Sequence, residues 1–110
     1  MRAMKMSERS KRVASVLKEK IPPLFQQFLS PNQVGFVTVT EIEVAGDLGI
    51  ADVYVRSIGG PKDFIKAIQK VAPKMEYEVS QQVQLRRPMR LRFKLDKSAQ
   101  ATGKIRDLLS

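Results

Sequence analysis

The chain of 110 residues contains no cysteine, no histidine and no tryptophan. Without cysteine it has no disulfide, no thiol nucleophile and no cysteine-ligated metal. Without histidine it lacks the commonest general base and the commonest metal ligand. Both absences argue against most hydrolases and metalloenzymes. These absences predict no histidine- or cysteine-based catalytic residues and no metal, and nothing else in the sequence indicates a cofactor or a small-molecule substrate.

Long hydrophobic runs are also missing. No apolar run approaches the roughly 20 residues that a membrane span needs, and no apolar stretch follows the basic N-terminal residues, as a secretory signal would require. Hydrophobic residues make up 43% of the chain and charged residues 28%, an ordinary globular balance. We expect one domain over residues 1–110, with no membrane partner, monomeric and located in the cytoplasm.

Positive charge is in excess and unevenly placed. The chain has 20 Lys and Arg against 11 Asp and Glu, a net charge of +9. Residues 1–20 hold seven bases and two acids, residues 85–97 hold six bases and one acid, and residues 41–54 hold four acids and no base. Such segregation favours a binding face for an anionic partner, although basic residues can also simply keep a small domain soluble.

The first part of the chain has a helical pattern. Val13, Leu17, Ile21 and Leu24 recur at spacings of three and four, which predicts a helix between about residues 7 and 29. Pro22 and Pro23 lie inside this pattern and each removes a backbone donor. The sequence therefore predicts a kink near Ile21 or a break there.

Two strands are predicted next, over residues 35–44 and 51–58, joined by a short glycine-rich turn as an antiparallel hairpin. In the first strand Val37 and Val39 are out of phase with Ile42 and Val44, which predicts a bulge or burial on both faces. Most aromatic side chains, including Phe36, fall on apolar phases and are expected in the core.

A second helical period begins near Pro61 and continues to Val83, interrupted by Pro73. The residue before a proline is displaced from the helical region, so we expect two helices meeting in a kink at Ala72 and Pro73. A short final helix is expected after Asp96, capped by Ser98. Gly59-Gly60-Pro61 lacks the spacing of a phosphate-binding loop and is interpreted as a turn.

Residues 89–95 alternate strictly, with Arg90, Arg92 and Lys94 on one face of a strand and apolar residues on the other. Basic groups on one strand face repeat about every 7 Å, close to the phosphate spacing of a nucleic-acid strand. We therefore expect this face to contact RNA. The alternative is that it pairs with Glu41 or Glu43 on a neighbouring strand.

These elements, in this order, resemble the ribosome-binding factor A family. The resemblance lies in Arg9-Ser10-Lys11-Arg12-Val13-Ala14, in the hairpin residues 37–55, in Leu85-Arg86 with Pro88, Leu91, Phe93 and Asp96, and in the closing residues 103–109. No single motif is diagnostic, but their order and spacing together are specific.

The resemblance implies an α+β fold of the KH-like (type II) kind, helix-strand-strand-helix-kink-helix-strand, with a three-stranded mixed sheet and helices on one face. Where the family typically has a kink of the form Ala-x-Gly, this chain has Ala72-Pro73-Lys74. The resemblance also implies a non-enzymatic factor that binds the immature 30S small ribosomal subunit and assists late maturation of 16S rRNA in bacteria. The RNA-contacting residues expected are Arg9, Lys11, Arg12, Lys74, Arg86, Arg87, Arg90, Arg92 and Lys94.

Two other functions fit the same composition: a generic KH-type RNA-binding protein, and a small basic ribosomal protein. The missing glycine loop weighs against the first, since that loop clamps the RNA backbone in KH domains. A plastid or mitochondrial location is the alternative to a bacterial cytoplasm.

Overall fold

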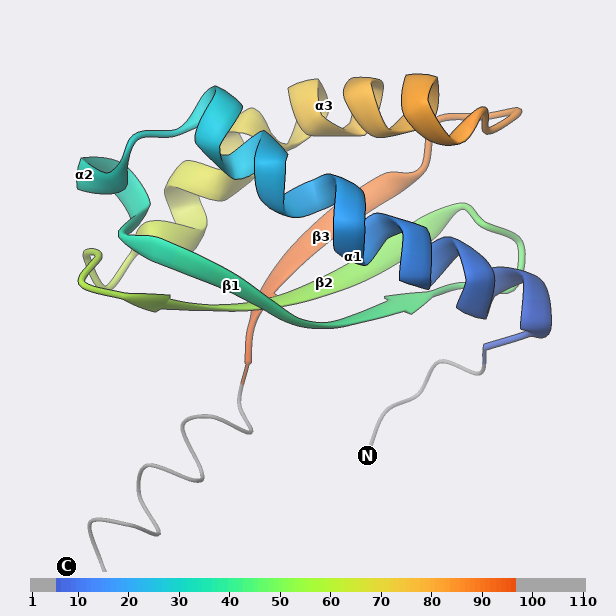
Figure 1. The fold of residues 1–110 in the computed structure, drawn as a ribbon, viewed down its shortest axis with the longest axis horizontal. Coiled ribbons are helices and arrows are strands. Elements are labelled where there is room, and N and C mark those ends of the chain that lie inside the picture. Colours follow the sequence, from blue (N-terminus) through green and yellow to red (C-terminus); the bar gives the residue numbers. More distant parts are fainter. Residues whose placement is uncertain (1–5, 97–110) are drawn as a thin grey trace, which may run out of the picture.

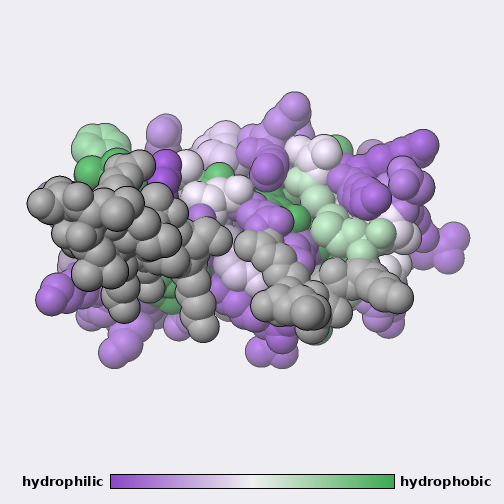
Figure 2. All heavy atoms as spheres, turned by 90° about the horizontal axis from the view of Figure 1, so that it is seen from below, coloured by the Kyte–Doolittle hydropathy of each residue, from purple (hydrophilic) through white to green (hydrophobic). Residues whose placement is uncertain are grey.

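The computed structural model describes residues 6–96. The expected final helix with Ser98 lies outside these residues. The described elements are α1 (Glu8–Phe28), α2 (Pro31–Val34), β1 (Phe36–Val44), β2 (Ile50–Ile58), α3 (Phe64–Val83) and β3 (Arg90–Leu95). The long helices lie side by side on one face of the sheet (Figure 1). Seen from the opposite side, the visible described surface is mostly hydrophilic (Figure 2).

The sheet has the order β1-β2-β3, so β2 is central. β1 and β2 pair antiparallel, and β2 and β3 pair parallel. The mixed sheet is therefore as expected. The register shifts between Val39 and Glu41, which confirms the bulge. The extra residue keeps Val39 opposite Val55 and Ile42 opposite Val53, so the valines before and the isoleucine after the bulge reach the same core.

The first helix is not broken by its prolines. α1 runs unbroken from Glu8 to Phe28 with Pro22 and Pro23 inside it. An interior proline costs about 3 kcal/mol in helix propensity. Beyond the prolines Leu24 and Phe25 are buried, and each fully buried side chain of this kind contributes about 1.5–3 kcal/mol. The two prolines together cost about 6 kcal/mol, which burial of Ile21, Leu24 and Phe25 around them is large enough to offset.

The prediction of two helices around Pro73 is likewise wrong, because α3 is one helix from Phe64 to Val83. It begins three residues after Pro61, with Asp63 as its N-cap residue. Ile68, Met75 and Val79 keep a single buried face along its whole length, and this face holds the two halves together. Figure 1 shows the axis of α3 changing direction near its middle.

Two further features differ from expectation. The short helix α2 is not among the predicted elements, and the Gln33 side chain at its start accepts the Ser30 N–H at 2.9 Å. Phe36 was expected in the core, but it is 75% exposed at the end of β1. Its cross-strand partner, Ile58, is also exposed, because the alternation along β1 and β2 places this pair, like Thr38 and Arg56, on the sheet face opposite the helices.

Candidate nucleic-acid interface

The expected RNA-contacting residues separate into two main surfaces. The first surface, called the corner below, consists of Arg9, Arg86 and Arg87. The second, called the strand face below, consists of Arg90, Arg92 and Lys94. They differ in which segments of the chain supply them and in whether an acid neutralises them.

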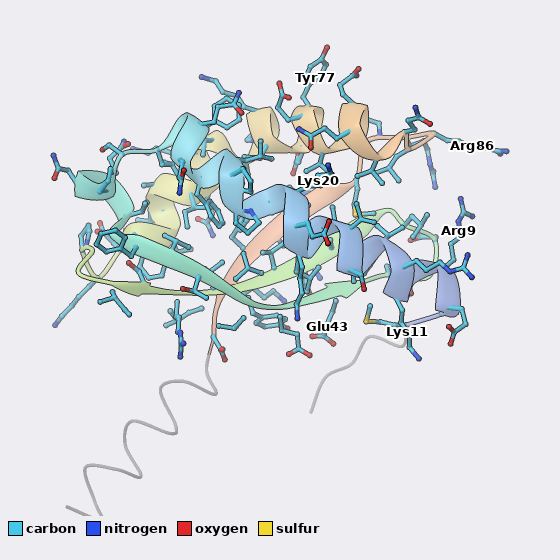
Figure 3. All side chains as sticks on the ribbon, viewed as in Figure 1. Arg9, Lys11, Lys20, Glu43, Tyr77 and Arg86 are labelled. Atoms are coloured by element: carbon cyan, nitrogen blue, oxygen red, sulfur yellow. The ribbon has the colours of Figure 1, made fainter. Side chains whose placement is uncertain are left out.

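The corner joins two distant segments of the chain. Arg9 lies in the first turn of α1, and Arg86 and Arg87 lie in the connection between α3 and β3. All three line a cavity of about 500 Å³ together with Asp47 and Leu48 of the β1–β2 turn. Figure 3 shows Arg9 and Arg86 at the same end of the molecule. Three exposed bases and one exposed acid therefore surround this cavity, and the excess of positive charge suits a phosphate.

Local structure fixes both sides of the corner. The Ser7 side chain caps α1 by accepting the Ser10 N–H at 3.1 Å, which orders the turn that carries Arg9. On the other side, α3 ends at Gln84 in the left-handed conformation, with φ 56°, and the chain turns away from the helix axis towards Arg86. The two arginine-bearing segments are thereby held at one end of the helical layer.

The strand face is partly neutralised by a buried acid. The parallel register places Arg92 beside Asp52 of β2. Arg92 donates from Nε to Oδ1 at 2.6 Å and from Nη2 to Oδ2 at 3.1 Å, and Lys94 Nζ donates to Oδ2 at 3.2 Å. The Asp52 side chain is only 6% exposed, whereas those of Arg92 and Lys94 are 45% exposed. Two of the three cations are therefore held by one carboxylate.

The pKa of Asp52 reflects this arrangement. Burial raises the pKa, but the hydrogen bonds and charges of Arg92 and Lys94 outweigh burial and leave the pKa below its ordinary value. Asp52 is thus ionised at neutral pH and holds both cations. Pairing of the strand face with Glu41 or Glu43 was the expected alternative. The acid that the structure places on Arg92 and Lys94 is Asp52 instead, which the sequence interpretation did not link to this strand.

The remaining expected residues lie elsewhere. Lys11 points away from the side of α1 that carries Arg9, and its Nζ lies 3.7 Å from Glu8 Oε1 in an exposed pair (Figure 3). Arg12 is exposed three residues after Arg9, on a neighbouring position of the helix. Lys74 is exposed in the middle of α3. The structure does not bring Lys11 or Lys74 into the corner.

A second cavity lies at the kink residues. It has a volume of about 690 Å³ and is lined by Ala72, Pro73 and Glu76 of α3 and by residues 88–94. Glu76 accepts the Leu91 N–H at 2.9 Å and so covers the outer edge of β3. Among residues 6–96 no cluster of acidic side chains is suited to hold a metal, and no helix is long and apolar enough to cross a membrane.

Comparison with known proteins assigns the family. Residues 9–109 match the family model described as ribosome-binding factor A. The chain belongs to the ribosome-binding factor A family. It is 38% identical to ribosome-binding factor A of Macrococcus caseolyticus, over 96% of this chain and 95% of the relative. It is 39% identical to that of Desulfitobacterium hafniense, over 92% of this chain and 83% of the relative.

Solved structures of the family share the fold. The crystal structure of ribosome-binding factor A from Thermus thermophilus superposes with a TM-score of 0.70 at 20% identity, covering 78% of this chain and 94% of that chain. A homology model of the Thermus thermophilus factor, as fitted into the cryo-EM map of its 30S complex, gives a TM-score of 0.66 at 20% identity, covering 76% of this chain and 91% of that chain. The α+β fold with a three-stranded mixed sheet is therefore a feature of this family.

Proposed function

We propose that this protein binds the immature 30S ribosomal subunit and assists late maturation of its 16S rRNA without catalysing a reaction itself. The observation that carries this proposal is membership of a family whose relatives, over nearly the whole chain, are ribosome-binding factors. The Thermus thermophilus factor has itself been fitted into a map of a 30S complex. Its partners are then the small subunit and its rRNA, and the expected location is the bacterial cytoplasm.

The fold is interpreted as a KH-like variant. Its helix-strand-strand-helix-strand order supports this, with α3 taking the place of the two middle helices of the KH pattern. A bend within one helix, at Ala72 and Pro73, stands where KH domains carry a glycine loop. A proline-containing helix offers fewer free backbone N–H groups than that loop, so phosphate contacts fall mainly to Arg and Lys side chains.

The corner is proposed as the main phosphate-binding surface, with Arg12 beside it. Arg9, Arg86 and Arg87 have no recorded ion pair with another described residue, and they converge from two segments on one cavity. Arg92 and Lys94 would have to exchange the Asp52 carboxylate for a phosphate, which gains less than binding a phosphate at an unpaired cation. The strand face therefore contributes to RNA binding chiefly through Arg90.

The proposal is tested by separating ribosomal particles on a sucrose gradient from cells producing tagged protein. An assembly factor is found with free 30S particles and precursor 16S rRNA, and is depleted from 70S ribosomes. A ribosomal protein would instead remain in 70S particles, and a generic RNA-binding protein would stay with lighter RNA fractions. Either of these distributions would refute the proposed function. Gel filtration of purified protein tests the expected monomer.

A further inference from the structure

Tyr77 is a large aromatic side chain on the outside of the helical layer. It is 63% exposed and points away from the sheet (Figure 3). The other strongly exposed apolar residues among 6–96, Phe36 and Ile58, are cross-strand partners at the end of the hairpin. Tyr77 has no such partner, and α3 packs on the sheet through Ile68, Met75 and Val79, on its opposite face. Packing of the core therefore does not account for this ring.

Three lysines precede Tyr77 on the same surface of α3. Lys66, Lys70 and Lys74 are all exposed and follow one another at intervals of four residues. Four helical residues rise about 6 Å, so their ammonium groups form a line spaced much like successive phosphates of a nucleic-acid strand. Lys74 is three residues before Tyr77 and therefore adjacent to it on the helix surface. We call these three lysines and Tyr77 the α3 ridge.

The acids near Tyr77 in the sequence do not neutralise the ridge. Glu76 and Glu78 are each one residue from Tyr77, so they lie about 100° away around the helix, one on each flank. The Glu76 carboxylate accepts the Leu91 N–H at 2.9 Å. None of the three ridge lysines has a recorded ion pair with any residue of 6–96. The ridge therefore presents unpaired positive charge beside one aromatic face.

We infer that Tyr77 is a stacking platform for an unpaired RNA base, with the adjoining phosphates held along Lys66, Lys70 and Lys74. Aromatic side chains stack on bases that are splayed out of single-stranded loops or ends, and cations beside them hold the backbone. Charge complementarity favours RNA over an apolar protein segment as the occupant. α3 ends towards the corner, so an RNA strand following the ridge arrives at Arg86 and Arg87.

This inference rests on the proposed RNA-binding function and deepens it, since it names a second contact and the kind of RNA bound there. Stacking contacts and phosphate contacts differ in how they affect the salt dependence of the RNA affinity. A phosphate contact on single-stranded nucleic acid adds about 0.7 to the slope of log affinity against log salt, whereas a stacked base adds nothing to this slope. A base-free polyanion can occupy the lysines but cannot stack.

The chain itself supplies the reporter, because it has two tyrosines and no tryptophan. In the variant Tyr54→Phe, tyrosine fluorescence comes from Tyr77 alone. Saturation with a short single-stranded oligoribonucleotide should quench this emission, and saturation with polyphosphate should leave it unchanged. The variant Tyr77→Phe, which reports Tyr54 alone, is the matched control and should show no quenching.

Affinity measurements complete the test. Tyr77→Ala should weaken oligoribonucleotide binding about 5- to 150-fold with an unchanged salt slope. Tyr77→Phe, which keeps the ring, should bind like the wild type, and Gln82→Ala, an exposed change about 140° around the helix from Tyr77, should have no effect. Lys74→Gln should lower the salt slope by about 0.7.

Absence of quenching at saturation, or a Tyr77→Ala variant that binds like the wild type, would overturn the inference. So would a Tyr77→Ala variant that binds free RNA normally but no longer co-sediments with 30S particles, since Tyr77 would then contact a ribosomal protein. The wild-type protein is run on the same gradients. Normal co-sedimentation of the wild type with a negative stacking result refutes only the role of Tyr77, whereas a wild type that never meets 30S particles refutes the proposed function.

Discussion

On the strand face, Arg92 and Lys94 share one buried carboxylate, whereas at the corner Arg9, Arg86 and Arg87 surround an open cavity. Both regions carry three basic residues within one small domain. Charge on the strand face serves first to compensate Asp52, whose burial would be costly without a partner. Charge at the corner has no such internal use and is available to an external anion. Local basic density alone therefore does not identify a binding surface.

The largest expected effect is on RNA binding at the corner. Replacing Arg9, Arg86 and Arg87 together by Gln removes three phosphate contacts and should flatten the wild-type slope of log affinity against log salt by about 2–3. The fold should survive because all three side chains are exposed. A salt titration with small-subunit rRNA, together with co-sedimentation and a thermal midpoint, measures this.

The matched variant replaces Arg90, Arg92 and Lys94 by Gln and removes the same charge from the strand face. Alternation along the strand alone ranks this variant as the more damaging for binding. Because Arg92 and Lys94 are paired with Asp52, we expect the reverse order. The strand-face variant should lose thermal stability more than it loses affinity for RNA. A strand-face variant that loses co-sedimentation while the corner variant keeps it would show that the RNA lies on the sheet.

An intermediate effect is expected at Asp52 itself. Asp52→Asn keeps the shape but removes the charge that holds Arg92 and Lys94, and should lower the free energy of unfolding by about 1–3 kcal/mol. The matched control is Asp63→Asn, which removes one exposed charge that makes no capping hydrogen bond. Thermal unfolding at neutral pH should separate the two variants by several degrees.

The pH dependence has a defined sign. Because the folded-state pKa of Asp52 is lowered, its stabilisation is complete above the ordinary carboxyl pKa and is lost as the pH falls through the lowered value. The difference in stability between the wild type and Asp52→Asn should therefore shrink in that acidic range. If Asp52→Asn instead keeps full stability and gains RNA affinity, Asp52 is an internal competitor of RNA and the strand face is a latent binding surface.

Features with local causes could be predicted from the sequence. The bulge appears as a change of phase between Val39 and Ile42, and the basic strand as strict alternation. Features that depend on contacts between residues far apart in the sequence could not be predicted. The ion pair of Asp52 with Arg92 depends on the parallel register, which no local pattern specifies. The convergence of Arg9 with Arg86 likewise follows from the packing of α1 beside α3.

The prolines also show the limit of prediction from local sequence, because here a local signal is present but tertiary packing overrides it. Propensity predicts a kink or a break near Pro22 and two helices meeting in a kink at Pro73, but both helices continue because residues on each side share a buried face. Because proline has no N–H, the Lys18 carbonyl lacks its usual intrahelical donor at Pro22, and the Gln69 carbonyl lacks its usual donor at Pro73. Both of these residues are exposed, so water can bind the freed carbonyls.

The smallest expected effect is at Pro73 and separates a structural bend from a functional one. Pro73→Ala restores an N–H that can donate to the Gln69 carbonyl, so the free energy of unfolding should stay the same or rise, by less than about 3 kcal/mol. If the bend sets the angle between the α3 ridge and the corner, straightening it should weaken RNA binding by less than about tenfold, ~1.4 kcal/mol. Pro22→Ala makes the same chemical change in the C-terminal part of α1, about 15 Å along the helix from Arg12, and should leave RNA affinity unchanged. Equal affinities for both variants and the wild type would mean that the bend has no role in binding, and that the corner and the ridge act as independent sites.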